Sequence, residues 1–245
     1  MILKKFTAEI GSEVPATGES CNRDRMPAPQ NWRPRNVIIH TMSSFDLLSI
    51  GHSNVSADRF LAMLQNAGVS GVVDVRSAPS SHHFPWFAKK NLAAALARND
   101  IAYAFMGDTL GGRPHEQSLY RAGIANYEAM AKQPVFHSGL ELLIDAAAQS
   151  AVCMMCAERE PLDCHRCLLV ARSLAARGLT IGHILHDGTI EPHATTERGL
   201  LALYGQGLDQ TCDLFATGQH PRLAAAYRRR AHAVAFRRKV AMPAA

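Results

Sequence analysis

Reactive side chains are concentrated between residues 152 and 167. Four of the six cysteines lie there, beside a glutamate, a histidine and an arginine. The members of this group are Cys153, Cys156, Glu158, Cys164, His165, Arg166 and Cys167. A thiol can act as a nucleophile, an imidazole or a carboxylate can move protons, and a guanidinium group binds anions. The group therefore predicts a site that binds or transforms an anionic or electrophilic ligand, but it identifies neither the ligand nor a cofactor.

The run Cys164-His165-Arg166 opens a helix that the sequence predicts over residues 164–177. The first turn of a helix carries free backbone N–H groups and the positive end of the helix dipole, which bind anions and lower the pKa of a thiol. Arg166 adds a forked donor that suits phosphate, sulfate or carboxylate. Cys164 is therefore a candidate nucleophile beside an anion site. In the alternative interpretation, Asp163 only caps the helix, Cys164 is a small filler and Arg166 is a surface charge.

Cys156 stands at the end of a strand predicted over residues 151–155, where several cysteine-dependent α/β enzymes place a nucleophile. The alternative is an inert thiol, because free cysteine is often buried and packs as a small apolar side chain. That alternative is the stronger one for Cys153, which lies inside the apolar run. The catalytic candidates are Cys156, Glu158, Cys164 and His165.

Two Cys-x-x-Cys pairs raise the question of a metal site. Such pairs are a strong zinc signature when both lie in turns. Here Cys153 and Cys156 belong to a strand, where residues three apart point to opposite faces, so a four-cysteine site is disfavoured. A smaller site formed by Cys156, Cys164 and a histidine stays open, but the interpretation adopted is one without a metal.

Three histidines form a second candidate group. His183 and His186 flank the end of another predicted strand, and His193 follows a predicted turn at Asp187-Gly188. They could ligate a metal or act as acid–base groups. Alternatively, His183 is a core residue bonded to the backbone, and the other two histidines lie on a loop.

The elements that position these residues alternate between strand and helix. A strand over 46–50, a helix capped by Ser56 and stopped by Gly68, and a strand over 71–75 predict two parallel strands joined by a helix. Further strands are predicted over 101–105, 151–155 and 180–185, and further helices over 88–98, 122–132, 134–149, 164–177 and beyond 194. This order predicts an α/β fold with an open, mostly parallel, Rossmann-like sheet and helices on both faces.

In such a sheet, ligands bind at the edge where the carboxyl ends of the parallel strands meet. Polar residues follow the first two predicted strands, and a Gly-Gly-Arg loop could bring backbone close to a phosphate. The ligand-binding candidates are His52, Ser53, Arg76, Ser80, Arg113 and Arg166.

Composition limits the class of protein. Hydrophobic residues make up 47% of the 245 residues, which is ample for a core. No run approaches the roughly 18 apolar residues that indicate a membrane span, and the N-terminus lacks a secretory signal. A cytoplasmic location, free thiols and no membrane partner are therefore expected. An anionic small molecule is the expected partner, and the oligomeric state stays undetermined.

The net charge of +5 comes from the C-terminal end of the chain. Seven basic residues and no acidic residue follow Pro221, and the remainder has 19 basic and 21 acidic residues. Such a tail can bind nucleic acid through phosphates, but a solvated tail or a surface helix is the favoured interpretation. We expect a leader that is disordered or loosely attached over 1–43, an α/β domain over 44–195, and a helical extension with the basic tail over 196–245.

Several of these segments, in this order, resemble the bacterial family called domain of unknown function 488, over roughly residues 45–195. The matching residues are Ser49-Ile50-Gly51-His52-Ser53, Asp74-Val75-Arg76-Ser77, Pro79, Ser80, Tyr103, Leu110-Gly111-Gly112-Arg113, Cys156-Ala157-Glu158, Cys164-His165-Arg166, His183-Ile184, Asp187-Gly188 and His193. The resemblance implies a compact α/β domain whose signature includes Cys156, Glu158 and the Cys164-His165-Arg166 run, but neither Cys153 nor Cys167. Near position 81 the family usually carries arginine, whereas this chain has His82-His83. The family name carries no activity.

Three functions remain, and the sequence does not decide whether the protein is an enzyme. The favoured one is a thiol-dependent enzyme that acts on a phosphorylated or sulfur-containing small molecule, because reactive residues follow several strands. The alternatives are a non-catalytic nucleotide or nucleic-acid binding module and a metal-binding protein.

Overall fold

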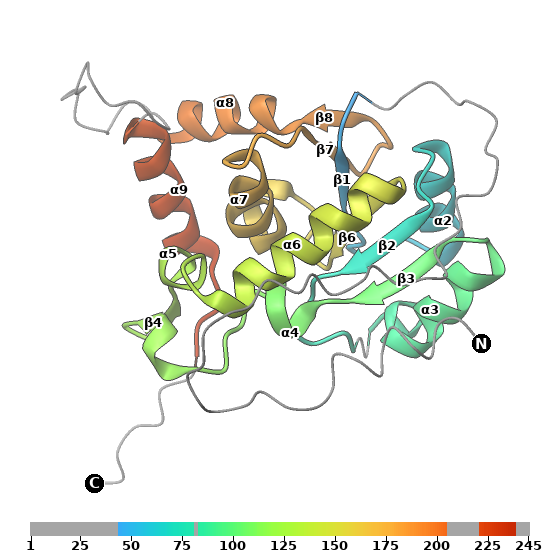
Figure 1. Cartoon of the computed structure of the whole chain (residues 1–245), viewed down its shortest axis with the longest axis horizontal. Coiled ribbons are helices and arrows are strands. Elements are labelled where there is room, and N and C mark those ends of the chain that lie inside the picture. Colours follow the sequence, from blue (N-terminus) through green and yellow to red (C-terminus); the bar gives the residue numbers. More distant parts are fainter. Residues whose placement is uncertain (1–43, 81–82, 205–220, 239–245) are drawn as a thin grey trace, which may run out of the picture. The chain divides into compact units, whose positions relative to one another are not determined.

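A computed structural model of the chain describes residues 44–80, 83–204 and 221–238. Within these residues, six strands form one sheet in the order β3-β2-β6-β1-β7-β8 (Figure 1). The strands are β1 (Leu47–Gly51), β2 (Gly71–Asp74), β3 (Ala102–Phe105), β6 (Val152–Cys156), β7 (Ile181–Ile184) and β8 (Ile190–Pro192). All neighbouring strands are parallel except β8, which pairs antiparallel with β7. The predicted open, mostly parallel sheet is confirmed. The predicted leader and His82 lie outside the described residues.

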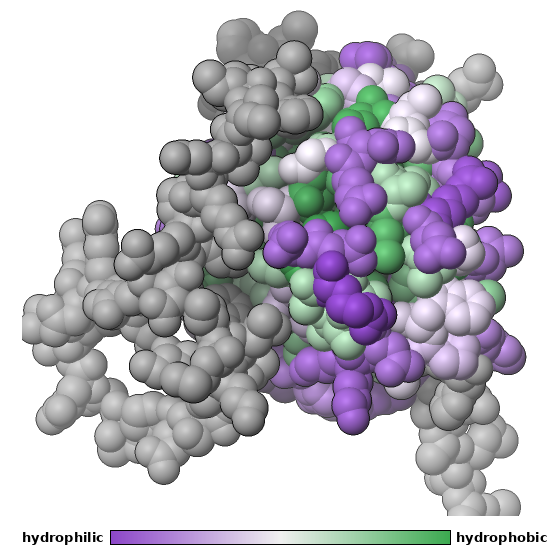
Figure 2. Space-filling model, turned by 90° about the vertical axis from the view of Figure 1, so that its right-hand side faces the viewer, coloured by the Kyte–Doolittle hydropathy of each residue, from purple (hydrophilic) through white to green (hydrophobic). Residues whose placement is uncertain are grey.

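Helices cover both faces of the sheet, as predicted (Figure 1). One face carries α2 (Ala57–Asn66), the short helix η1 (Pro85–Phe87) and α3 (Lys89–Arg98). The other carries α4 (Gly107–Leu110), α5 (Tyr127–Met130), α6 (Pro134–Gln149), η4 (Arg166–Ala171), α7 (Arg172–Ala175), α8 (His193–Tyr204) and α9 (Pro221–Val234). Hydrophilic side chains are spread over the side of the molecule where α2 and α3 lie, with smaller hydrophobic areas between them (Figure 2). Amphipathic helices that cover a sheet have this pattern.

The alternation of side chains along β6 separates the cysteines. Cys153 and Met155 pack in the core against α2 and α3, whereas Met154 and Cys156 pack in the core on the other face. Cys153 and Cys156 therefore point to opposite faces and cannot share one metal ion, as the strand assignment predicts.

The first helix begins as predicted, because the Ser56 hydroxyl accepts the backbone N–H of Arg59 at 3.2 Å. The predicted helix over 122–132 is wrong in its first half. Ala122 and Gly123 have φ angles of 49° and 76°, which form a tight turn between β4 (Tyr120–Arg121) and β5 (Ile124–Ala125). Left-handed backbone of this kind ends a helix, so only α5 remains helical.

The helix after the cysteines also differs from the prediction. It is preceded by a single turn, η3 (Pro161–Asp163), and its first part, η4, is a π-helix that continues into α7. Gly178, with a φ of 89°, ends it as predicted. A further short helix, η2 (Gln117–Leu119), precedes β4. Among the described residues, no helix is long and apolar enough to span a bilayer.

Candidate functional site

A pocket of about 220 Å³ opens beside the carboxyl ends of β2 and β6. Residues that follow these two strands line one side, and the Gly112-Arg113 loop, α5 and the segment after α9 line the other. The lining side chains that carry chemistry are Arg76, Arg113, Tyr127, Cys156, Glu158, Asp163 and His165. The pocket therefore lies at the edge of the sheet where the strand order predicts a ligand.

The four catalytic candidates meet at this pocket. One carboxylate oxygen of Glu158, Oε2, lies 2.8 Å from the sulfur of Cys156 and 3.0 Å from the sulfur of Cys164. Nδ1 of His165 lies 3.6 Å and 3.9 Å from the same two sulfurs. Both thiols, the carboxylate and the imidazole are thus close enough to exchange protons.

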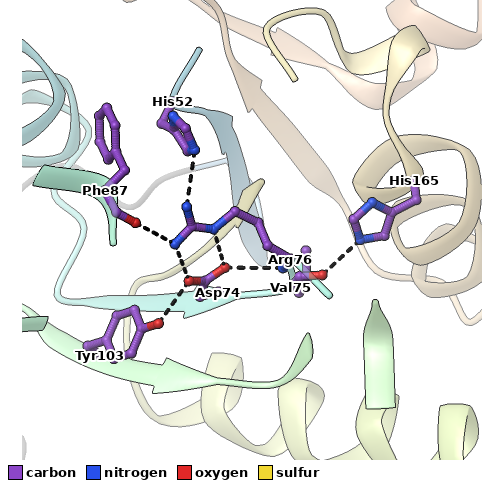
Figure 3. Close-up of polar contacts among 7 residues, drawn as sticks. All are labelled: His52, Asp74, Val75, Arg76, Phe87, Tyr103 and His165. Carbon is purple, nitrogen blue, oxygen red and sulfur yellow. Dashed lines mark hydrogen bonds and ion pairs between the residues drawn. The ribbon is translucent and has the colours of Figure 1, made fainter. Parts of the chain in front are cut away.

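The ring of His165 is fixed in one orientation. Its Nε2–H donates to the carbonyl oxygen of Val75 at 2.9 Å, at the end of β2 (Figure 3). Nδ1 is then the nitrogen that faces the sulfurs. Gly112 makes room for the ring, because a Cβ atom at this position would lie 2.7 Å from Cγ of His165.

Arg166 is absent from the pocket lining and has no exposed surface. Its guanidinium group donates to the carbonyl oxygens of Glu158 at 2.6 Å and Arg159 at 2.9 Å, and its backbone N–H points to the sulfur of Cys164 at 3.4 Å. Gly51 lets this loop approach β1, because a Cβ atom there would lie 1.9 Å from the Glu158 carbonyl oxygen. The alternative that Arg166 is a surface charge is therefore wrong. Arg166 holds the loop that carries Glu158 and adds a buried positive charge.

These contacts separate the pKa values of the two thiols. Burial raises the pKa of Cys164, but the hydrogen bond from Cys156 and the charges of Arg166 and His165 outweigh burial and hold the pKa well below its usual range. Burial and the neighbouring Cys164 raise the pKa of Cys156. Burial lowers the pKa of His165, but the hydrogen bond and charge of Cys164 reverse this and raise it. A Cys164 thiolate beside an imidazolium, with the proton kept on Cys156, follows from these directions.

Glu158 lies at the mouth of the pocket and is exposed as a whole residue, although Oε2 is in contact with both sulfurs. Desolvation and the charge of Cys164 raise the pKa of its carboxyl group. Glu158 can therefore hold a proton in a pH range where an exposed glutamate is ionised, and it can take part in proton transfer.

Arg76 also lines the pocket, but its guanidinium group belongs to a second polar group (Figure 3). Its Nε and Nη2 donate to the two oxygens of Asp74 at 2.9 Å and 2.6 Å, and Nη2 also donates to the Phe87 carbonyl oxygen at 2.8 Å. Nη1 contacts Nε2 of His52 at 3.2 Å, and the His52 ring stacks on Phe87 with 4.0 Å between centroids. The Tyr103 hydroxyl donates to Asp74 at 2.8 Å. Most donors of Arg76 are thus used within the protein.

The other ligand-binding candidates are placed as follows. Arg113 lines the pocket, with its guanidinium carbon 4.7 Å from the centre of the Phe236 ring. The backbone N–H of Ser53 donates to the Ala157 carbonyl oxygen at 2.9 Å, which helps to anchor the loop after β6. Ser80 is exposed. The structure therefore brings Arg76 and Arg113 to the pocket of the thiols but leaves His52, Ser53 and Ser80 outside its lining.

Several residues of the pocket are absent from the sequence-based candidates, among them Tyr127 and Phe236. Tyr127 lies in the segment predicted as a longer helix, and burial, with Cys164 and Glu158 nearby, raises its pKa. Phe236 belongs to the basic tail, where its carbonyl oxygen accepts the N–H of Ala125 at 2.9 Å, so that the tail extends the β4–β5 hairpin. Asn126, directly before Tyr127, caps α5. Asparagine is a preferred helix cap, so this residue is a sequence signal for a helix that begins at Tyr127.

The arginines of the described part of the basic tail contact the rest of the domain. Arg228 lies 3.4 Å from Glu128, and Arg230 forms an ion pair with Asp163. Arg238 donates to the side chain of Gln117 at 2.6 Å and stacks on a tyrosine ring. Lys239 lies outside the described residues.

Comparison with protein families identifies one segment. Residues 56–173 match the family described as Domain of unknown function DUF488. This confirms the resemblance over a segment that contains Arg113 and all four catalytic candidates. Neither a search of curated proteins nor a search of solved structures gave a match.

Proposed function

We propose that this protein is a thiol-dependent enzyme that acts on a small anionic molecule, either phosphorylated or sulfur-containing. The observation that carries the proposal is the contact of two sulfurs with one carboxylate oxygen and one imidazole nitrogen at the wall of a pocket. Such a group supplies a nucleophile and the acid and base that its reaction requires.

The two thiols have different roles in this proposal. Cys156 lines the pocket and Cys164 does not, although both residues are almost completely buried. Cys156 attacks the electrophilic atom of the substrate and forms the new covalent bond, while its proton passes to the Cys164 thiolate. The leaving group takes a proton from the His165 imidazolium, which regains it from Cys164. The net change is transfer of one substrate group to sulfur and of one proton to the leaving group.

Positive charge favours an anionic substrate. Arg113 lines the pocket, whereas Arg166 is buried outside its lining. Both side chains remain charged at neutral pH, and the low dielectric surroundings of Arg166 strengthen its effect. A phosphate, sulfate or carboxylate group bound near Arg113 would place a neighbouring electrophilic atom against the sulfur of Cys156.

The experiment that tests the proposal is site-resolved alkylation with iodoacetamide between pH 5 and 9, with and without phosphate or thiosulfate. Mass spectrometry distinguishes the cysteines. We expect the Cys156–Cys164 pair to react far below pH 8.5, the usual pKa of a free thiol, and both anions to slow the reaction. Arg113→Gln should remove the protection by anions but leave the reaction itself.

The matched control is Cys153→Ser, since Cys153 is equally buried but belongs to the opposite face. This variant should alkylate like the unchanged protein, whereas Cys164→Ser should slow the reaction of Cys156. If both thiols titrate as free cysteines in metal-free protein, or if neither anion protects them, the proposed enzyme is ruled out.

A second candidate function uses the same atoms as a metal centre. The donor atoms of Cys156, Glu158, Cys164 and His165 all lie within 4.8 Å of one another, and these groups are typical ligands of zinc. The Val75 carbonyl oxygen holds the outer nitrogen of His165, as is usual for a metal-bound imidazole. Zinc bound at one ion per chain that blocks alkylation of both thiols, and that is lost in Cys164→Ser, would favour this function over the thiol nucleophile.

A further inference from the structure

A chain of hydrogen bonds runs through the core on the face covered by α8 and α9. The Ser49 hydroxyl lies 2.6 Å from Nδ1 of His183, and Nε2 of His183 lies 2.9 Å from Nδ1 of His193. Nε2 of His193 lies 3.1 Å from the Tyr227 hydroxyl, which donates to Glu197 at 2.9 Å. The five residues come from β1, β7, α8 and α9, so the chain links the sheet to the C-terminal helices.

Only one order of protons satisfies every link when both imidazoles are neutral. Tyr227 donates to the carboxylate, so its oxygen accepts the Nε2–H of His193, whose Nδ1 is then unprotonated. His183 donates its Nε2–H to that nitrogen and accepts from Ser49. Burial lowers the pKa of both histidines, and the charges of Arg166 and the other imidazole lower that of His183 further. Two neutral imidazoles therefore face each other in the core.

Cys167 completes a group of three donors. Its sulfur lies 4.0 Å from Nδ1 of His193, and the donor atoms of Cys167, His183 and His193 all lie within 4.8 Å of one another. All three residues are buried, with exposures of 0%, 0% and 4%. They come from three elements, η4, β7 and the start of α8, so no local turn brings them together. His186 does not belong to the group, and His193 begins a helix and does not lie on a loop.

We propose that Cys167, His183 and His193 bind a zinc ion. With zinc bonds of about 2.3 Å to sulfur and 2.0–2.1 Å to nitrogen, tetrahedral ligand atoms are separated by roughly 3.3 Å for two nitrogens and 3.6 Å for nitrogen and sulfur. The corresponding separations here are 2.9 Å and 4.0 Å. Shifts of a few tenths of an ångström, within the range of side-chain rotation, convert one arrangement into the other.

The surroundings of the two imidazoles suit a metal ion. A metal-bound histidine almost always donates its outer N–H to a neighbouring acceptor. Here Nε2–H of His193 donates to Tyr227, and Nδ1 of His183 faces the Ser49 oxygen, which accepts once the ring changes tautomer. The carboxylate of Glu197, 3.6 Å from Nε2 of His193, adds negative charge. The inner nitrogens are left to face the metal.

Proton balance follows from these contacts. The thiol proton of Cys167 is released to solvent, and the Nε2 proton of His183 is replaced by one on Nδ1, so binding of Zn²⁺ releases one proton. No fourth histidine, cysteine or acidic side chain of the described residues joins the group, so water completes the coordination. The ion would fasten η4 and α8 to the sheet, and α9 through Tyr227. The proposal does not depend on the proposed enzyme activity.

The test is metal analysis of the full-length protein purified without chelators and dialysed against metal-free buffer. We expect one zinc per chain in the unchanged protein, in Cys153→Ser and in Cys164→Ser, and loss of zinc in Cys167→Ser. Tyr227→Phe, which removes the hydroxyl that accepts from His193 and donates to Glu197, should weaken zinc binding by about 10–100-fold. Replacement of zinc by Co²⁺ should give a sulfur-to-cobalt charge-transfer band that Cys167→Ser lacks.

Two results would overturn the zinc site. One is metal-free protein whose melting temperature and spectra do not change when zinc or cobalt is added. The other is zinc that Cys167→Ala retains and Cys164→Ser loses, which assigns the ion to the thiol pocket. Cys167→Ala leaves the hydrogen-bonded histidines intact, so it keeps the test meaningful if histidine variants do not fold. Zinc should raise the melting temperature of the unchanged apoprotein by mass action but not that of this variant.

Discussion

The carbonyl oxygen of Val75 holds Nε2 of His165 at 2.9 Å and thereby turns Nδ1 towards the sulfurs of Cys156 and Cys164. The end of a neighbouring strand thus decides which imidazole nitrogen faces the thiolate. The charge on the imidazole depends on this orientation, because only the nitrogen that faces the sulfurs can form the ion pair.

Replacement of this imidazole should raise the pKa of Cys164. In His165→Gln the thiolate loses its cationic neighbour, and each unit of pKa increase lowers the thiolate fraction near pH 7 about tenfold. Iodoacetamide alkylation of the Cys156–Cys164 pair at pH 7 should therefore slow by about tenfold. The control is His137→Gln, since His137 is exposed, contacts Arg177 and does not line the pocket. An unchanged rate in His165→Gln would show that Arg166 alone stabilises the thiolate.

Mild oxidation should join Cys156 to Cys164. Their sulfurs contact the same carboxylate oxygen, and a thiolate is the species that forms a disulfide. Peptide mapping after treatment with oxidised glutathione should find this bond in the folded protein, while Cys153 and Cys167 remain reduced in the core. A bond between Cys164 and Cys167 would contradict the arrangement of the pocket.

Gly51→Ala should disrupt the site by displacing the loop that carries Glu158. The new methyl group would meet the Glu158 carbonyl oxygen at 1.9 Å, so the loop that Arg166 holds must move. We expect a loss of about 1–3 kcal/mol in the free energy of unfolding, as for other overpacked positions, and slower alkylation of Cys156. Gly199→Ala in α8 is the control, because nothing lies within 4 Å of its added Cβ, and it should stabilise the protein by roughly 0.5–1 kcal/mol. Equal stability of both variants would contradict the prediction.

The protein should lose stability in mild acid through His52. Burial, together with the charge of Arg76, lowers the pKa of His52 to about 4. The Arg76 guanidinium donates to Nε2, so a proton there would set two donors against each other. Because the unfolded state takes up this proton near pH 6.5 and the folded state does not, stability is full above that pH and falls as the pH drops towards 4.

Between pH 7.5 and pH 5 the loss assigned to His52 is about 2 kcal/mol. Urea denaturation of the unchanged protein and of His52→Gln over this range measures it, since a glutamine oxygen still accepts from Arg76 but does not titrate. The variant should show a shallower decline with falling pH. Parallel curves would mean that another group controls acid stability.

The sequence predicted the fold well because its strands are short apolar runs and its helices have clear start and stop signals. Ser56 caps α2, Gly178 ends α7, and Pro134 lies in the first turn of α6. Each of these residues has the predicted position in its helix, because such signals act through neighbouring residues of the chain. The helix predicted from residue 122 failed because the left-handed backbone at Ala122 is set by pairing of β4 with β5.

The thiol group of the candidate site was also accessible from sequence, since Cys156, Glu158 and Cys164 lie at a strand end and the loop after it. The sequence does not show which arginines bond to groups within the protein and which face the pocket. Arg76 and Arg166 both follow strand ends, yet their guanidinium groups bond to Asp74 and to loop carbonyl oxygens, respectively. These partners lie only two to eight residues away, so the choice between them and a ligand depends on how the folded chain buries each side chain. The pairing of His183 with His193, through a hairpin turn, is of the same kind.

Phe236 and Val234 line the pocket from the segment at and after the end of α9, whereas the two sulfurs belong to β6 and the loop after it. Chains fold from the N-terminus as they are synthesised. The thiols can therefore meet His165 and Glu158 while this wall of the pocket has not yet been translated. During that interval the sulfurs are open to small oxidants on one more side than in the finished protein.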